Sequence, residues 1–254
     1  MTDDQNNTHG DGKTVALFAT CLVDLMRPNV GFASAQLLDE AGYNVVVPIG
    51  QTCCGQPAYN GGDRRSARRA ARHTIRVLSG YDYVVVPSGS CAAMIKEHYP
   101  RLFSHGSKDH QDAVSLSNRT HELTSFLHEV AKFKPRTDLG EEVLTYHDSC
   151  SGLRELNIQD QPRALLNVCE GGRLVEMEKP DTCCGFGGTF CVKYPDLSDR
   201  LVERKADDIV ATGAKRVVAG DVGCIMNMEG KLHRQGVSVP VSHVAEILAG
   251  MADD

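Results

Sequence analysis

The stretch Thr52-Cys53-Cys54-Gly55 occurs again as Thr182-Cys183-Cys184-Gly185, 130 residues further along the chain. Adjacent cysteines rarely form a disulfide with each other, because the geometry of the bridge strains the peptide between them. Two neighbouring thiols ahead of a glycine, present twice, therefore indicate a group that binds both sulfurs in each copy.

Further cysteines follow the same repeat. Cys21 corresponds to Cys150 at an offset of 129 residues, and Cys91 corresponds to Cys224 at an offset of 133. A period of about 130 residues is too long for a solenoid unit and indicates a duplicated domain. The cysteines without a counterpart are Cys169 and Cys191.

The composition is that of a globular protein. The chain has 254 residues, of which 41% are hydrophobic and 24% charged, so there is room for one large or two small domains. A net charge of −6 argues against nucleic-acid binding, for which a basic chain is typical. No run approaches the roughly 20 apolar residues of a membrane span, and the N-terminus lacks the basic and apolar segments of a signal peptide. We therefore expect a cytoplasmic protein whose ten cysteines are reduced, with a disordered tail over residues 1–13.

Short β-branched or apolar runs alternate with helix-length segments. This alternation predicts an α/β fold of two tandem, duplicated domains, each with a parallel sheet like that of a Rossmann fold and related by a pseudo-twofold axis. The domains are expected over residues 14–133 and 140–252. The predicted strands cover residues 15–19, 43–47, 83–86, 143–146, 174–177 and 216–219, and the predicted helices cover residues 33–41, 64–78, 92–103, 122–130, 197–212 and 244–249.

The paired cysteines follow the predicted strands. Ligands of parallel α/β sheets bind beyond the carboxyl ends of the strands, so the four thiols of each half can converge at one edge, and we expect both sites to lie near the interface between the halves. Gly55 and Gly185 are expected to let the backbone pass close to a bulky inorganic group. The candidate metal and cofactor ligands are Cys21, Cys53, Cys54 and Cys91 in the first half and Cys150, Cys183, Cys184 and Cys224 in the second.

The thiol pattern leaves the metal open. Zinc sites commonly show short C-x₂₋₄-C spacing, which is absent from the paired pattern. Iron–sulfur clusters take four thiolates each from widely varying spacings, so the pattern favours clusters over zinc. A single catalytic cysteine would not require a repeated array of four thiols.

Beyond the cysteines, the flanking residues carry a family resemblance. The segments Cys53-Cys54-Gly55-Gln56-Pro57-Ala58-Tyr59-Asn60, His147-Asp148-Ser149-Cys150 and Cys183-Cys184-Gly185-Phe186-Gly187-Gly188-Thr189-Phe190 resemble the lactate-utilisation protein A family. This family is related to the heterodisulfide reductases and to the glycolate oxidase iron–sulfur protein through the cysteine-rich CCG domain. The resemblance extends over residues 14–250.

The resemblance implies an iron–sulfur electron-transfer subunit of an L-lactate oxidising (L-lactate dehydrogenase) complex. It implies 4Fe–4S clusters, with zinc as an alternative at one site, and two further subunits that include a ferredoxin-type iron–sulfur protein. On this basis the chain is expected to be part of an oxidoreductase rather than a complete enzyme, with L-lactate as a possible ligand. The other functions left open are a zinc-stabilised structural or assembly subunit and a thiol–disulfide reductase.

The sequence departs from these relatives at four positions. Heterodisulfide reductase-type domains end in C-x-x-C, whereas this chain has Met94 and Asn227 at the last position, so four thiolates per half are the upper expectation. Ser151 stands where a histidine is expected after Asp-Ser-Cys. Cys191 is an additional cysteine, interpreted as a buried free thiol more readily than as a substitute ligand.

Polar residues near the second thiol set are candidates for chemistry. His147 and Asp148 precede Cys150 and could act as a ligand, a proton carrier or an orienting pair, although a histidine beside a strand end is more often structural. With Arg154 they form the candidate catalytic group.

A basic helix is the remaining candidate for a functional surface. Arginines recur every fourth residue from Arg64 to Arg76, with Arg65 and Arg69 beside them. The pattern fits a solvated helix face, or alternatively a docking surface for an acidic ferredoxin-like subunit.

Overall fold

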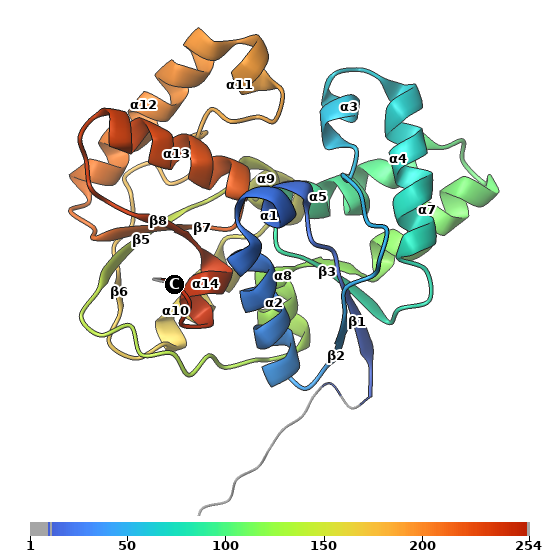
Figure 1. Ribbon diagram of the computed structural model, residues 1–254, viewed down its shortest axis with the longest axis horizontal. Helices are drawn as coiled ribbons and strands as arrows, with labels where there is room; N and C mark the ends of the chain where they lie inside the picture. The colour runs from blue at the N-terminus through green and yellow to red at the C-terminus, as the bar shows by residue number, and fades with distance from the viewer. Residues whose placement is uncertain (1–9, 11, 253–254) are drawn as a thin grey trace, which may run out of the picture.

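The computed structural model describes residue 10 and residues 12–252. The tail predicted over residues 1–13 lies mostly outside this range. Two four-stranded parallel sheets stand side by side, one formed by the blue-to-green half of the chain and one by the yellow-to-red half (Figure 1). The predicted α/β fold with a duplicated parallel sheet is confirmed.

The two sheets have the same strand order. In the first half, β1 (Thr14–Leu17) lies between β2 (Asn44–Val46) and β3 (Tyr83–Val86), and β4 (Thr120–Glu122) pairs with β3. In the second half, β5 (Val143–His147) lies between β6 (Arg173–Leu174) and β7 (Arg216–Ala219), and β8 (Val241–His243) pairs with β7. In each half the second strand is added on one side of the first strand, and the third strand on the other side. Open α/β sheets bind ligands at the point where the strand order reverses in this way.

Helices cover both sheets. Those of the first half are α1 (Cys21–Met26), α2 (Pro28–Glu40), α3 (Gln56–Asn60), α4 (Arg64–Val77), α5 (Gly89–Ala93), α6 (Tyr99–Leu102), α7 (Lys108–Asn118) and α8 (Leu123–Ser125), with π-helical turns over Met94–His98 and Phe126–Val130. Those of the second half are α9 (Cys150–Leu156), α10 (Asp160–Val168), α11 (Phe190–Lys193), α12 (Pro195–Ala211), α13 (Val222–Arg234) and α14 (Val244–Leu248). Within the described residues no helix is long and apolar enough to cross a membrane.

The edge strands differ from the sequence-based prediction. β4 and β8 are three residues each and were not predicted, and β6 ends at Leu174, although a strand was expected over residues 174–177. The helices predicted from residues 122 and 244 begin with different capping residues. His243 caps α14, through a hydrogen bond from the Ala245 N–H to Nδ1, but in the first half the equivalent cap is Glu122.

The two halves share one apolar core. It joins side chains of β1 and α2, such as Leu17 and Leu37, to side chains of β5 and α14, such as Leu144 and Leu248, all of them buried. Two smaller clusters lie within the separate halves, under α4 to α7 and under α12 and α13. Burial of this shared core fixes the two sheets relative to each other. The predicted domain limits at residues 133 and 140 stay a prediction.

A close contact between α5 and α9 brings the two candidate sites together. An added Cβ on Gly89 would lie 3.0 Å from Gly152 Cα and 2.9 Å from Ser149 Oγ. Only glycine allows the two helix starts to approach this closely, and these are the helices that carry Cys91 and Cys150.

Candidate metal centre

All eight paired cysteines line one cavity between the halves. Its volume is about 320 Å³, and α3 contributes Gln56, Pro57 and Asn60 to its wall, while the loop before α11 contributes Phe186 and Gly187. The sequence predicted one site at the edge of each sheet, and the structure brings these two sites to a common space.

Each thiol is positioned by the same local structure in both halves. Cys21 and Cys150 begin the helices that follow β1 and β5, whereas Cys91 and Cys224 lie in the first turns of α5 and α13, after β3 and β7. Helix N-termini favour negative charge, because the unpaired N–H groups and the positive end of the helix dipole lie there. The adjacent pairs come from the loops after β2 and β6. The helix ends can therefore stabilise thiolates at the edge of each sheet.

The four sulfurs of each half are joined in the same order. Cys53 hydrogen-bonds with Cys21 and Cys54, and the Cys54 and Cys91 sulfurs lie 3.3 Å apart. In the second half Cys183 hydrogen-bonds with Cys150 and Cys184, and Cys184 with Cys224. The buried thiols also correspond, and they are Cys54 and Cys91 in the first half and Cys184 and Cys224 in the second.

Thiol contacts distribute the negative charge unevenly. Hydrogen bonds from Cys21 and Cys54 hold the pKa of Cys53 well below its usual value, and Cys150 and Cys184 do the same for Cys183. The pKa of Cys54 and Cys184 is raised, first because each gives its hydrogen bond to the neighbouring cysteine and also because each is buried. A bound cation would replace the shared protons, since metal ligands must be deprotonated.

The two CCG glycines are required by the backbone. Gly55 and Gly185 have φ of 86° and 82°, in the left-handed region that other residues rarely adopt. A Cβ on Gly55 would lie 2.9 Å from Ala70 Cβ in α4, and one on Gly185 would lie 2.5 Å from Ser198 O in α12. The expectation that these glycines leave room for an inorganic group was therefore wrong, because the missing Cβ faces a helix. Their N–H groups instead point to the Cys53 and Cys183 sulfurs, at 3.5 and 3.3 Å.

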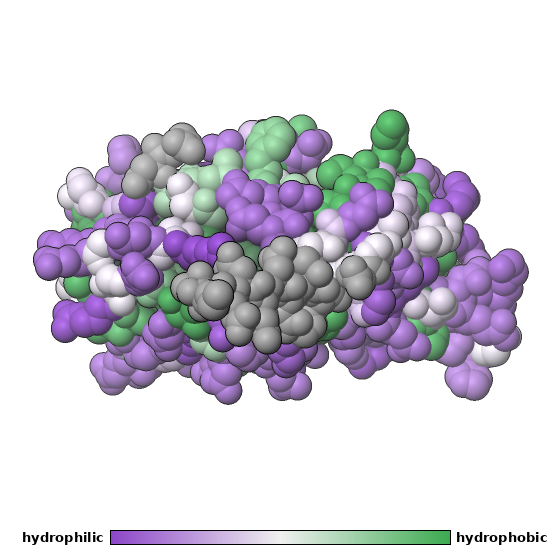
Figure 2. Space-filling view, turned by 90° about the horizontal axis from the view of Figure 1, so that it is seen from below, coloured by the Kyte–Doolittle hydropathy of each residue, from purple (hydrophilic) through white to green (hydrophobic). Residues whose placement is uncertain are grey.

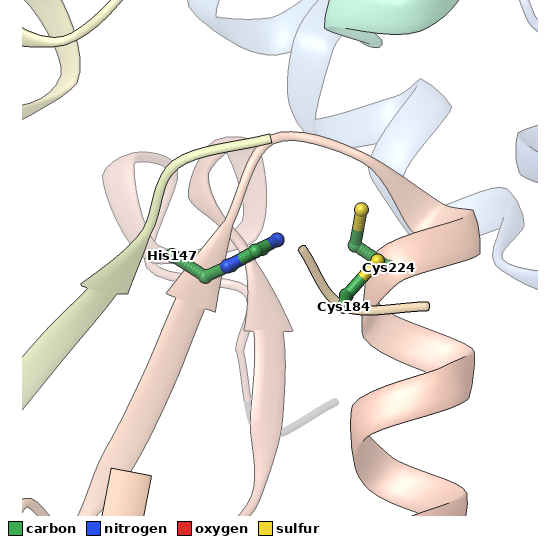
Figure 3. A group of neighbouring side chains, drawn as sticks. All are labelled: His147, Cys184 and Cys224. Carbon is green, nitrogen blue, oxygen red and sulfur yellow. The ribbon is translucent and has the colours of Figure 1, made fainter. Parts of the chain in front are cut away.

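His147 is directed at the second thiol set (Figure 3). A ring nitrogen of His147 and the Cys184 and Cys224 sulfurs all lie within 4.8 Å of one another, and all three residues are buried. Neither ring nitrogen has a hydrogen-bond partner among the described residues. Leaving a buried polar group unpaired costs about 1–3 kcal/mol. Burial lowers the pKa of His147 to about 3, so the imidazole is neutral at pH 7, the form that binds metals.

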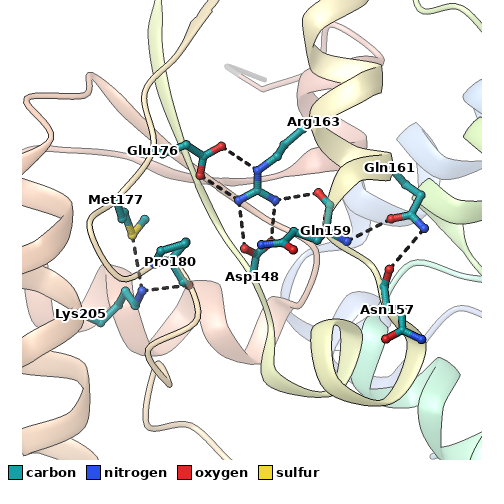
Figure 4. A network of polar contacts seen from close by, with 9 residues as sticks. All are labelled: Asp148, Asn157, Gln159, Gln161, Arg163, Glu176, Met177, Pro180 and Lys205. Carbon is teal, nitrogen blue, oxygen red and sulfur yellow. Dashed lines mark hydrogen bonds and ion pairs between the residues drawn. The ribbon is translucent and has the colours of Figure 1, made fainter.

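Asp148 has a structural partner. Arg163 donates to both of its carboxylate oxygens, at 2.8 and 3.0 Å, and also to Glu176 (Figure 4). The Asp148 side chain is fully buried and that of Arg163 is 14% exposed. This bidentate pair fixes the link between β5 and α9, directly before Cys150. The sequence could not indicate this pair, because Arg163 lies outside every motif.

The remaining candidates lie apart from the thiols. Arg154 is exposed, hydrogen-bonds to the carbonyl of Asp181 at 3.5 Å, and is not among the described residues that line the cavity. Cys191 was expected to be buried but is partly exposed, with its thiol donating to the Gly188 carbonyl. Cys169 is buried in the shared core, and Ser151 lines the cavity. The catalytic assignment of His147, Asp148 and Arg154 stays a prediction.

Other residues support the site without having been predicted. Asp221 lines the cavity and accepts hydrogen bonds from the hydroxyls of Ser88 and Ser90, at 2.6 and 2.8 Å, and from the Ser90 N–H. The second half thereby caps the helix that carries Cys91. Tyr99 and Asn227 each donate to the carbonyl of a CCG cysteine, Cys54 and Cys184, at 2.7 Å.

Comparisons with known proteins agree with this geometry. The cysteine-rich domain family named CCG matches residues 15–96 and 144–229. A lactate utilization protein A from Geobacillus is 44% identical over 92% of this chain and 98% of its own length, and one from Shouchella clausii is 42% identical over the same shares. The chain belongs to the lactate utilization protein A family.

A solved structure shares the fold of this family member. A hypothetical protein from Helicobacter pylori matches with a TM-score of 0.69 at 10% identity, over 95% of this chain and 49% of that one. At this identity the likeness concerns the fold alone. The family resemblance read from the CCG, His-Asp-Ser-Cys and Cys-Cys-Gly-Phe-Gly-Gly segments is confirmed.

Proposed function

We propose that the chain is the iron–sulfur electron-transfer subunit of a complex that oxidises L-lactate. The observation that carries the proposal is the pair of equivalent four-thiol sets facing one cavity. Iron–sulfur clusters are held by four thiolates, and each half supplies four within hydrogen-bonding contact of one another. The lactate part of the proposal comes from the names of the relatives.

The residues present fit such clusters by donor type and number. The first set would be Cys21, Cys53, Cys54 and Cys91, and the second Cys150, Cys183, Cys184 and Cys224. A bound cluster would accept and release single electrons. The protein's own part is to hold the thiolates at helix starts, to exclude water from the four buried sulfurs, and to bring both sets to one space. A short separation between two redox centres suits electron transfer between them.

The cavity opening is suited to contact with partner subunits. Val192 lines the cavity and is 80% exposed, so an apolar side chain lies open to solvent at this site. By contrast, the face seen from below in Figure 2 is mainly hydrophilic. We propose that two further subunits, one of them a ferredoxin-type protein, complete the lactate-oxidising system, which we place in the cytoplasm.

Zinc is the second candidate, favoured by one observation. His147, Cys184 and Cys224 form a buried nitrogen–sulfur group, which is the donor set of structural zinc sites. Zinc there would make the second half a structural or assembly element.

Metal analysis separates the two functions. The chain should be purified without oxygen and analysed for iron, acid-labile sulfide and zinc, with a visible absorption spectrum. We expect about four iron and four sulfide per filled thiol set and a brown protein. A colourless protein that contains zinc and no sulfide would contradict the iron–sulfur function.

A further inference from the structure

The two thiol sets differ at one buried position that faces them. His147 lies three residues before Cys150, and the residue three before Cys21 is Phe18. His147 is the last residue of β5 and Phe18 directly follows β1, and both residues are 1% exposed. Phe18 packs in the apolar cluster of the first half and has no donor atom. The second half therefore has five potential ligands where the first has four.

No other role in the described structure accounts for this imidazole. Neither ring nitrogen has a hydrogen-bond partner among residues 12–252, whereas buried polar side chains are normally paired. His243, at the end of β8, shows the ordinary structural use, because its Nδ1 accepts the N–H of Ala245. Lys205 and Cys183 are charged groups that act on His147, and the carboxylate of the adjacent Asp148 is paired with Arg163.

The ammonium group of Lys205 hydrogen-bonds to backbone carbonyls and not to His147. Its Nζ donates to the carbonyls of Lys179 and Pro180, at 2.9 and 3.1 Å. What remains beside the His147 ring is sulfur, from Cys184 and Cys224. Iron, cobalt and zinc all bind both nitrogen and sulfur ligands. Any of these metals, bound by the Cys184 and Cys224 sulfurs, would also give the unpaired imidazole nitrogen of His147 a partner.

We propose that His147 is a direct ligand of the metal group in the second half, so that the two halves hold unlike centres. One centre is coordinated by thiolates alone and the other by thiolates and imidazole. The inference rests on the proposed function only in requiring that a metal group occupies the second thiol set. It does not depend on whether that group is a cluster or a single ion.

The test uses nitrogen-15 as the reporter. The full chain is produced with ¹⁵N-labelled histidine, reconstituted with iron and sulfide without oxygen, reduced, and studied by electron–nuclear double resonance. We expect a strongly coupled ¹⁵N that is present in the wild type, lost in His147→Phe and retained in His73→Phe. His147→Phe copies the residue of the first half, and His73 is a matched control because it lies on α4, hydrogen-bonds to the Gly50 carbonyl and is not among the described residues that line the cavity. Absence of a coupled nitrogen in the wild type, or its persistence in His147→Phe, would overturn the proposal.

A second arm keeps the inference separate from the iron–sulfur function. If no cluster assembles, the proposed function fails, and the metal-free chain is then titrated with Co²⁺ alone and measured by X-ray absorption. A nitrogen ligand in the wild type that disappears in His147→Phe supports the inference, together with a Co²⁺ affinity at that site at least tenfold lower. Shells of sulfur and oxygen alone in the wild type overturn it. Should His147→Phe not fold, His147→Gln replaces it, and the wild-type spectrum decides the point in either case.

Discussion

At the residue scale, the paired thiols are the most direct consequence of the sequence. Their spacing predicted two sets of four, and the structure brings together the eight cysteines that the repeat selected. Asp221 could not be found in this way, because its contacts with Ser88 and Ser90 span more than 130 residues and depend on how the halves pack. Gly55 and Gly185 were expected to make room for an inorganic group, but the sequence does not show which way an added Cβ would point, and in the structure it faces a helix.

Equivalent thiols should have equivalent effects on metal content. Cys54→Ser and Cys184→Ser each remove a buried sulfur from one set, so each is expected to lower iron and sulfide by about half. Cys191→Ser is the matched control, since Cys191 is not among the described residues that line the cavity, and it should leave the iron content unchanged. Unchanged iron in Cys54→Ser, whose set has Phe18 in place of a fifth donor, would contradict the view that both sets hold clusters.

A buried carboxyl should make stability depend on pH. Burial raises the pKa of Glu122 from 4.5 to about 7, although hydrogen bonds from Thr124 and Ser125 oppose the shift. The folded state then binds this proton more tightly than the unfolded state, so the stabilisation is complete below about pH 4.5 and is lost as the pH rises to 7. The difference is about 3 kcal/mol.

Denaturant unfolding of the wild type and Glu122→Gln from pH 4.5 to 8 measures this effect. As the pH rises, the free energy of unfolding of the wild type should fall relative to that of Glu122→Gln. Glutamine is the suitable replacement because it keeps the side-chain oxygen that caps α8. Parallel curves for the two proteins would show that Glu122 does not titrate in this range.

At the element scale, the strands at the centre of each sheet were predicted from the sequence, whereas the edge strands β4 and β8 were not. β3 and β7 were predicted at their observed limits, because runs of valine followed by small polar residues mark a buried strand and its end. β4 and β8 have three residues each and include Thr, His, Glu and Ser, a pattern too short and too polar for a strand prediction. Their strand conformation comes from pairing with β3 and β7, which is a tertiary effect.

The arginines of α4 form two groups: some make contacts within the first half, and others are exposed and available for docking. Arg68 donates to the Leu102 carbonyl and Arg72 pairs with Asp109, so these two residues stabilise the first half. Arg65 and Arg69 are exposed, and no ion pair of theirs is found within the described structure. If α4 docks an acidic subunit, Arg65→Glu with Arg69→Glu should weaken binding about tenfold or more and flatten its salt dependence.

Binding is measured by titration with the ferredoxin-type partner at two salt concentrations. Arg200→Glu with Arg204→Glu on α12 is the matched control, since α12 follows the second CCG loop as α4 follows the first. Equal binding by both double variants and the wild type would leave α4 as a solvated helix face.

At the scale of the whole molecule, the duplication determines what the cavity can do. The shared core and the α5–α9 contact hold the two sheets together, and both thiol sets open to one space of about 320 Å³. The sequence predicted the two sets near the interface between the halves, but not the single cavity that they share. The packing of one half on the other depends on contacts of Gly89, Gly152 and Asp221 between distant parts of the chain. Two adjacent clusters, if bound, would pass electrons one at a time, whereas oxidation of a 2-hydroxy acid releases two electrons and two protons together. The chain is therefore expected to depend on a partner that carries the substrate chemistry.

The most direct test is lactate-dependent dye reduction by the reconstituted chain, without oxygen, in the presence and absence of its partner subunits. The account predicts no turnover by the chain alone, turnover by the complete set, and loss of turnover when this chain is left out or carries both Cys54→Ser and Cys184→Ser. Full turnover of lactate by the chain alone would contradict the electron-transfer function and would place His147, Asp148 and Arg154 in an active site.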